Sequence, residues 1–109
     1  MNIKNTIYLI KRSIKFFWQR TIRGWDDSET WSLDAALSKL IVPRLKRFKE
    51  VNICYPPNMT PQEWDEKLDL MIEAFEFYSG EQYCASGEEL KKHQKGLNLF
   101  AKHFGKLWW

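Results

Sequence analysis

The stretch TPQEWDEKLDLMIEAFEFY, residues 60–78, decides the fold, because a helix start signal comes directly before a continuous apolar stripe. Thr60 supplies a capping hydroxyl, Pro61 takes the first helical position and Glu63 the third, an arrangement typical of a helix N-terminus. Apolar side chains then recur every four and three residues, which places them on one face of a helix. They are Trp64, Leu68, Met71, Phe75 and Tyr78. The opposite face is acidic and carries Asp65, Glu66, Asp69, Glu73 and Glu76.

Three other segments have the same helical periodicity. Residues 2–20 carry an apolar stripe at Ile3, Ile7, Ile10, Ile14 and Phe17. Residues 32–50 are expected to face inward through Leu33, Leu37, Leu40, Ile41, Leu45 and Phe48. A second capping box at residues 86–89 precedes a last helix with Leu90, His93, Leu97, Phe100, Phe104 and Leu107 on one face.

Pro43 falls inside the second of these segments, where it cannot donate to the carbonyl of Lys39. A kink or a break is therefore expected near residues 40–42. Gly96 and Gly105 lower the helix propensity of the last segment and would permit close helix approach. Together the four segments predict an all-α fold: a small helical bundle of about four helices with a proline-kinked second helix, residues 1–109 forming one domain.

Charge is distributed unevenly along the chain. Its net charge is +3 over 109 residues, yet residues 1–24 hold six basic side chains and no acidic one. Residues 1–22 thus predict a basic amphipathic helix, which can lie on a membrane or pack on a partner chain. The simpler interpretation is a bundle helix with a basic exposed face, because the rest of the chain supplies matching stripes. No apolar run is long enough to predict a membrane span.

Motifs for catalysis and metal binding are missing from the sequence. There is no phosphate-cradling glycine loop, no nucleophile elbow and no HExxH pair, so we expect neither an enzyme nor a cofactor. His93 and His103 lie ten residues apart, too far to share a metal ion, and His93 is interpreted as a core histidine. Nucleic-acid binding is not expected either, because no recognised motif accompanies the basic cluster at residues 44–49.

The richest chemistry lies between the first two helical segments, in RGWDDSETWSLD, residues 23–34. Arginine and tryptophan can hold a nucleotide by phosphate contacts and stacking, and carboxylates can accept from its hydroxyls or amines. The predicted ligand-binding residues are Arg23, Trp25, Asp26, Asp27, Trp31, Asp34, Arg44 and Tyr55. The competing interpretation is a packed junction, in which both tryptophans are core anchors and Arg23 pairs with Asp27 or Asp34.

Residues 23–34 also resemble the signature of a family of small, uncharacterised proteins of tailed bacteriophages. The resemblance continues through Pro43-Arg44-Leu45, Tyr55-Pro56, Trp64-Asp65 and the ending FAKHFGKLWW at residues 100–109. It implies an accessory protein made in the cytoplasm of a bacterial host. Cys54 and Cys84, without a CxxC spacing or a signal peptide, fit that reducing compartment.

Two functions follow from these observations. The first is a non-enzymatic anti-defence protein, a homo-oligomer that binds and sequesters a nucleotide-like immune signal through the predicted site. The alternative is an inhibitor that binds a host defence protein or nucleoprotein directly, through the basic first helix and the aromatic tail at residues 107–109.

Overall fold

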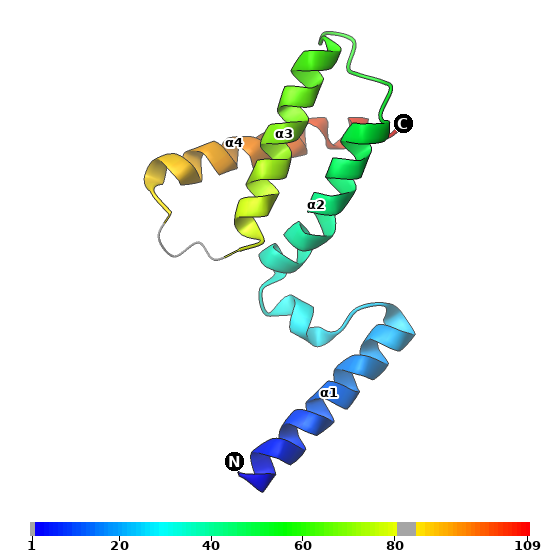
Figure 1. The fold of residues 1–109 in the computed structure, drawn as a ribbon, viewed down its shortest axis with the longest axis vertical. Helices are drawn as coiled ribbons and strands as arrows, with labels where there is room; N and C mark the ends of the chain where they lie inside the picture. Colours follow the sequence, from blue (N-terminus) through cyan, green and yellow to red (C-terminus); the bar gives the residue numbers. More distant parts are fainter. Residues whose placement is uncertain (1, 81–84) are drawn as a thin grey trace. The chain divides into compact units, whose positions relative to one another are not determined.

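The computed structural model describes residues 2–80 and 85–109, and within them the chain is helical with no strand. The elements are α1 Ile3–Arg23, η1 Asp27–Thr30, α2 Leu33–Val51, α3 Pro61–Tyr78, α4 Gly87–His103 and η2 Phe104–Lys106, where η marks a short 3₁₀ helix (Figure 1). The predicted all-α class and the four helical segments are confirmed. Cys84 lies outside the described residues. The chain divides into two compact units, Met1–Ala36 and Leu37–Trp109, each described below by itself.

Helix α3 is the centre of the second unit. The Thr60 hydroxyl accepts from the Glu63 amide at 3.1 Å and fixes the helix start, as the sequence predicts. Leu68 and Met71 are completely buried, and the core cluster also contains Leu45, Trp64, Ile72 and Phe75. The predicted stripe is therefore the core face, although Tyr78 at its end is only half-buried.

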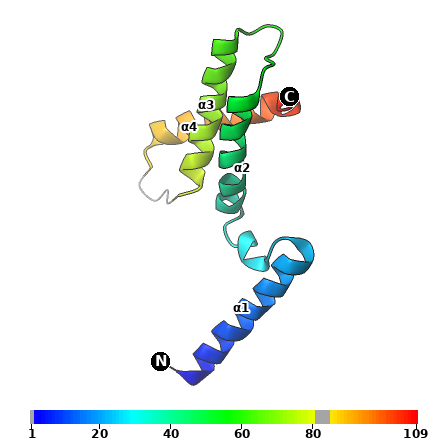
Figure 2. The same ribbon diagram turned by 45° about the vertical axis from the view of Figure 1, so that its right-hand side comes forward.

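Helix α4 crosses α3 at close range, as both ribbon views show (Figures 1 and 2). Gly96 makes this approach possible: a Cβ there would lie 2.5 Å from the Leu70 carbonyl oxygen and 2.6 Å from the Ala74 Cβ. Gly105 has nothing within 4 Å of such a Cβ, so the predicted close approach occurs at the first glycine and not at the second. Phe100 adds an edge-to-face contact with Phe75 at a centroid distance of 4.8 Å.

The acidic face of α3 is bound by lysines from both neighbouring helices. Lys46 and Lys49 of α2 reach Glu76 at 2.8 Å and Asp69 at 2.6 Å, and Lys92 of α4 reaches Glu73 at 3.2 Å. The Asp69 carboxylate raises the pKa of Lys49, because it accepts a hydrogen bond from the ammonium form. Exposed pairs of this kind contribute only about 0.2–1 kcal/mol each. They orient the helices more than they stabilise the core.

One expectation for α2 stays open and another needs correction. The helix runs unbroken from Leu33 to Val51 with Pro43 inside it, so no break occurs, and the kink stays a prediction. Its inward face is also shorter than expected. Leu33, Leu37 and Leu40 are each about half exposed, and the apolar side chains of α2 that pack on the core begin at Ile41.

Helix α1 belongs to the first unit and contains no buried residue. Asn2 caps its start by accepting from the Lys4 amide at 3.0 Å. Gly24 ends it with a φ of 85°, a left-handed conformation that suits glycine. The apolar stripe, which we expected to face the interior of the bundle, is exposed along its length.

Candidate functional site

The predicted site at residues 23–34 is a compact turn organised by Asp26. This carboxylate is 3% exposed and caps η1, accepting from the Ser28 amide at 2.9 Å and from the Ser28 hydroxyl. The Glu29 carboxylate accepts in return from the Asp26 amide at 2.7 Å, which completes a capping box. The hydrogen bond from Ser28, followed by that from Arg20, lowers the pKa of Asp26. Asp26 is thus a structural anion, held by the turn that it caps.

Asp27 connects this turn to the last turns of α1. Gln19 donates to its carboxylate at 2.7 Å and accepts from its amide at 2.8 Å. Arg23 pairs with the same carboxylate at 2.6 Å and Lys15 approaches it at 3.6 Å. The hydrogen bond from Gln19 contributes most to lowering the pKa of Asp27, and that from Arg23 comes second. The acidic groups of the junction, residues 23–34, that are described here are therefore paired with cations and hydrogen-bond donors of the same unit.

The two tryptophans of the junction pack on α1 and remain partly exposed. The Arg23 guanidinium lies 3.7 Å from the ring centroid of Trp25 and donates to the Trp25 carbonyl at 3.0 Å. Trp31 meets the Phe16 ring edge-to-face at 5.6 Å, and the Arg12 guanidinium lies 5.4 Å from the Trp31 ring. Neither tryptophan is a core anchor, since their exposed fractions are 45% and 64%.

The other predicted ligand-binding residues occupy separate places. Asp34 lies in the first turn of α2, within the first unit. Arg44 and Tyr55 belong to the second unit, and there they line different cavities. The Arg44 guanidinium donates to the Leu40 carbonyl at 2.7 Å, one turn earlier in its own helix. The structure thus gathers Arg23, Trp25, Asp26, Asp27 and Trp31 into one turn and does not add Arg44 or Tyr55 to it.

A cavity of about 400 Å³ lies on the side of the junction where α1 is basic. Its lining consists of Tyr8, Lys11, Arg12, Lys15, Phe16, Asp27 and Trp31. Three cations and exposed aromatic rings suit a planar anion, and this volume falls within the usual range for small-ligand sites. Of the predicted residues only Asp27 and Trp31 take part. The basic residues of the preceding helix were not expected to contribute.

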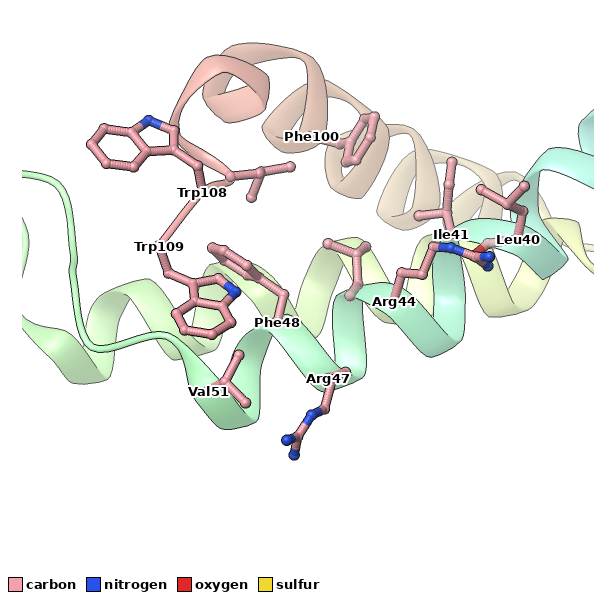
Figure 3. A pocket seen from close by; sticks show the side chains of 11 residues that line it. Leu40, Ile41, Arg44, Arg47, Phe48, Val51, Phe100, Trp108 and Trp109 are labelled. Atoms are coloured by element: carbon pink, nitrogen blue, oxygen red, sulfur yellow. The ribbon is translucent and has the colours of Figure 1, made fainter.

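The second unit carries an apolar groove of about 630 Å³. We call it the α2 groove; it is lined by Leu40, Ile41, Arg44, Leu45, Arg47, Phe48, Val51, Phe100, Leu107, Trp108 and Trp109. Figure 3 shows one wall on α2, from Ile41 to Val51, and the opposite wall on Phe100 and the C-terminal tryptophans. Trp108 and Trp109 are 72% and 69% exposed.

Arginine is the only charged residue type in the lining of the α2 groove. Arg44 lies along α2 toward Leu40, whereas Arg47 points away from the tryptophans in Figure 3 and pairs with Glu50 at 3.0 Å. A groove with apolar walls and a cationic edge accepts apolar side chains together with a carboxylate. Of the predicted site residues only Arg44 belongs to it. For the other groove residues, the signal in the sequence was the pair of tryptophans at residues 108 and 109.

His103 is the buried histidine of the core, a place that the sequence assigned to His93. His103 is 2% exposed, lies edge-to-face with Trp64 at 5.4 Å, and neither of its ring nitrogens has a hydrogen-bond partner among the described residues. Burial lowers its pKa, with a smaller contribution from Lys106. His93 is half-buried and stacks on Phe77 at 4.1 Å.

Over residues 2–80 and 85–109 no cluster of three or more His, Cys, Asp or Glu side chains could hold a metal ion. No protein-family model matches the chain, and neither the search of curated proteins nor that of solved structures gives a match.

Proposed function

We propose that this protein is a non-enzymatic phage accessory protein that inhibits a host protein by binding one of its helices in the α2 groove. The observation that carries the proposal is the large apolar hollow, whose wall includes two tryptophans about 70% exposed. Contiguous exposed apolar surface on a small protein marks an interaction site, and tryptophan and arginine are enriched among the residues that dominate binding energy.

The shape and charge of the groove define the partner segment. From Leu40 to Val51 the α2 wall is about 16 Å long, three turns of a helix, at the helical rise of ~1.5 Å per residue. This length suits an amphipathic helix that inserts side chains at positions i, i+3 or i+4, and i+7. The Arg44 guanidinium uses one donor on the Leu40 carbonyl, so others remain for an acidic side chain of the partner. We therefore propose an apolar helix with an acid at its edge.

The test is affinity capture from bacterial host lysate, followed by binding measurements with the purified partner. Trp109→Ala should weaken binding by at least about 30-fold, the loss expected for a central interface residue at ~2 kcal/mol. Arg44→Gln should weaken it less and reduce its salt dependence. Ile53→Ala is the matched control, because Ile53 is 85% exposed and lies outside the groove. A partner retained equally by all three variants would rule out the groove.

A nucleotide-like immune signal is the second candidate, supported by the basic and aromatic cavity beside the junction. There Trp31 would stack on the base while Lys11 and Arg12 met the phosphates. Calorimetry against cyclic nucleotides and ADP-ribose derivatives tests this, with Lys11→Glu as the disrupting variant and Lys91→Glu as the control. No heat at micromolar concentrations of folded protein would eliminate this candidate.

A further inference from the structure

The apolar stripe of α1 is an exposed apolar surface of the first unit. Ile3, Ile7, Ile10, Ile14 and Phe17 are between 47% and 75% exposed, and Trp18 beside them is 56% exposed. Over the 14 residue steps from Ile3 to Phe17 the stripe is about 21 Å long, at ~1.5 Å per residue. Sustained exposure of this kind marks a surface that binds something apolar.

The junction covers the side of α1 that faces away from the stripe. Four of the α1 side chains that it contacts are Arg12, Phe16, Gln19 and Arg23. These positions recur every three or four residues and, at 3.6 residues per turn, lie about half a turn round the helix from the isoleucines. The junction therefore packs against the side of α1 opposite the stripe and leaves the stripe exposed to solvent.

Charge identifies what the stripe binds. No acidic residue occurs in α1, and Asp26 and Asp27 of the junction already pair with Arg20, Arg23 and Lys15. Lys4 and Lys11 flank the stripe and have no ion-pair partner in the part of the chain that the structure describes. An apolar stripe edged by lysines and bearing Phe and Trp is complementary to an anionic lipid surface, with cations at the headgroups and apolar side chains below them.

A second copy of α1 fits this surface less well. Two identical helices would bring Lys4 and Lys11 of both copies to the same seam, without an acid to neutralise them. The stripe also covers only about two heptads, whereas coiled coils usually need three to four or more.

We propose that α1 binds flat on anionic membranes, with its isoleucine stripe inserted among the lipid headgroups. None of the described helices is long and apolar enough to cross a membrane, so α1 lies on the surface rather than through it. The stripe of α1 is distinct from the α2 groove, and membrane binding through the stripe does not depend on the function proposed for that groove.

The experiment is co-sedimentation of the full chain with vesicles of phosphatidylglycerol and phosphatidylcholine, compared with vesicles of phosphatidylcholine alone. The chain should bind the anionic vesicles at least about tenfold more tightly and lose this preference in high salt. Ile7→Asn combined with Ile14→Asn should weaken binding by at least about tenfold, since membrane affinity follows the apolar area inserted. Leu9→Asn, an exposed apolar position off the stripe, should stay within about twofold.

A second pair of variants tests the lysines. Lys4→Glu with Lys11→Glu should remove the preference for anionic vesicles, whereas Lys91→Glu with Lys95→Glu should keep it. Light scattering of the same samples without lipid measures oligomeric state. Failure to sediment with anionic vesicles, equal binding to neutral vesicles, or equal loss in the Leu9 variant would each overturn the proposal. One further result would overturn it: the chain does not bind vesicles and instead forms an oligomer, which the Ile7 and Ile14 substitutions dissociate.

Discussion

Replacing Gly96 with alanine tests the close crossing of α3 and α4, on which the second unit is built. A Cβ at this position would lie 2.5 Å from the Leu70 carbonyl oxygen and 2.6 Å from the Ala74 Cβ. Neither atom is the far end of a flexible side chain. To restore an ordinary separation of 3.4 Å, the two helices must move apart by about 1 Å. Such a shift also disturbs the neighbouring contact of Phe75 with Phe100.

Two opposing effects decide the sign of the change. Alanine improves helix propensity by about 1 kcal/mol over glycine. Overpacking a close-packed interface costs about 1–3 kcal/mol, and contact with rigid backbone belongs at the upper end. Gly96→Ala should therefore lower the free energy of unfolding by about 2 kcal/mol. For a domain of this size that corresponds to a fall in Tm of roughly 8–16 °C.

Urea and thermal unfolding followed by circular dichroism measure this difference. Gly105→Ala is the matched control, because nothing lies within 4 Å of a Cβ there and its φ is not positive. It should change stability by no more than about 0.5 kcal/mol. If Gly96→Ala were as stable as the unsubstituted protein, or more stable, the two helices would not cross at the distance described.

Three further predictions concern the core and the junction. Burial lowers the pKa of His103 below its usual 6.5. As the pH falls, the imidazole therefore takes up a proton in the unfolded chain before it does so in the folded chain. The contribution of His103 to the free energy of unfolding should be complete above about pH 6.5 and decline below it. His103→Leu should remove that part of the decline in urea midpoints between about pH 7.5 and pH 5, whereas His93→Gln should keep it. Leu68→Ala should cost about 2–5 kcal/mol by calorimetry, since Leu68 is fully buried, and a smaller loss would contradict the assigned core. Asp26→Ala should speed hydrogen exchange at the Ser28 amide, and unchanged exchange would exclude the cap.

The sequence predicts local structure well where one residue type has one physical role. Thr60 caps α3 because its hydroxyl accepts a backbone hydrogen bond three residues later, and that arrangement is complete within the sequence itself. The stripe from Trp64 to Phe75 predicts the core face for a similar reason, since helical period fixes which side chains share a side.

The candidate sites were less predictable, because they depend on which surfaces meet. From the sequence, Arg23 and Asp27 are expected either to bind a ligand or to pair with each other. Only the folded junction shows the ion pair between them. The α2 groove needs residues 40–51 beside residues 100–109, and nothing local to either segment encodes that approach.

By itself, then, the sequence determined four helices, the capped starts of α3 and α4 and the buried side of α3, because these follow from hydrogen bonds and periodicity within a few turns. Tertiary structure decided that Gly96 and not Gly105 is the crossing point, and that His103 and not His93 is buried. It also decided that the stripe of α1 is exposed. Whether a side chain is buried depends on segments that are distant in the chain. An apolar stripe in the sequence indicates that the helix needs an apolar surface to pack on, but it does not specify which surface that is.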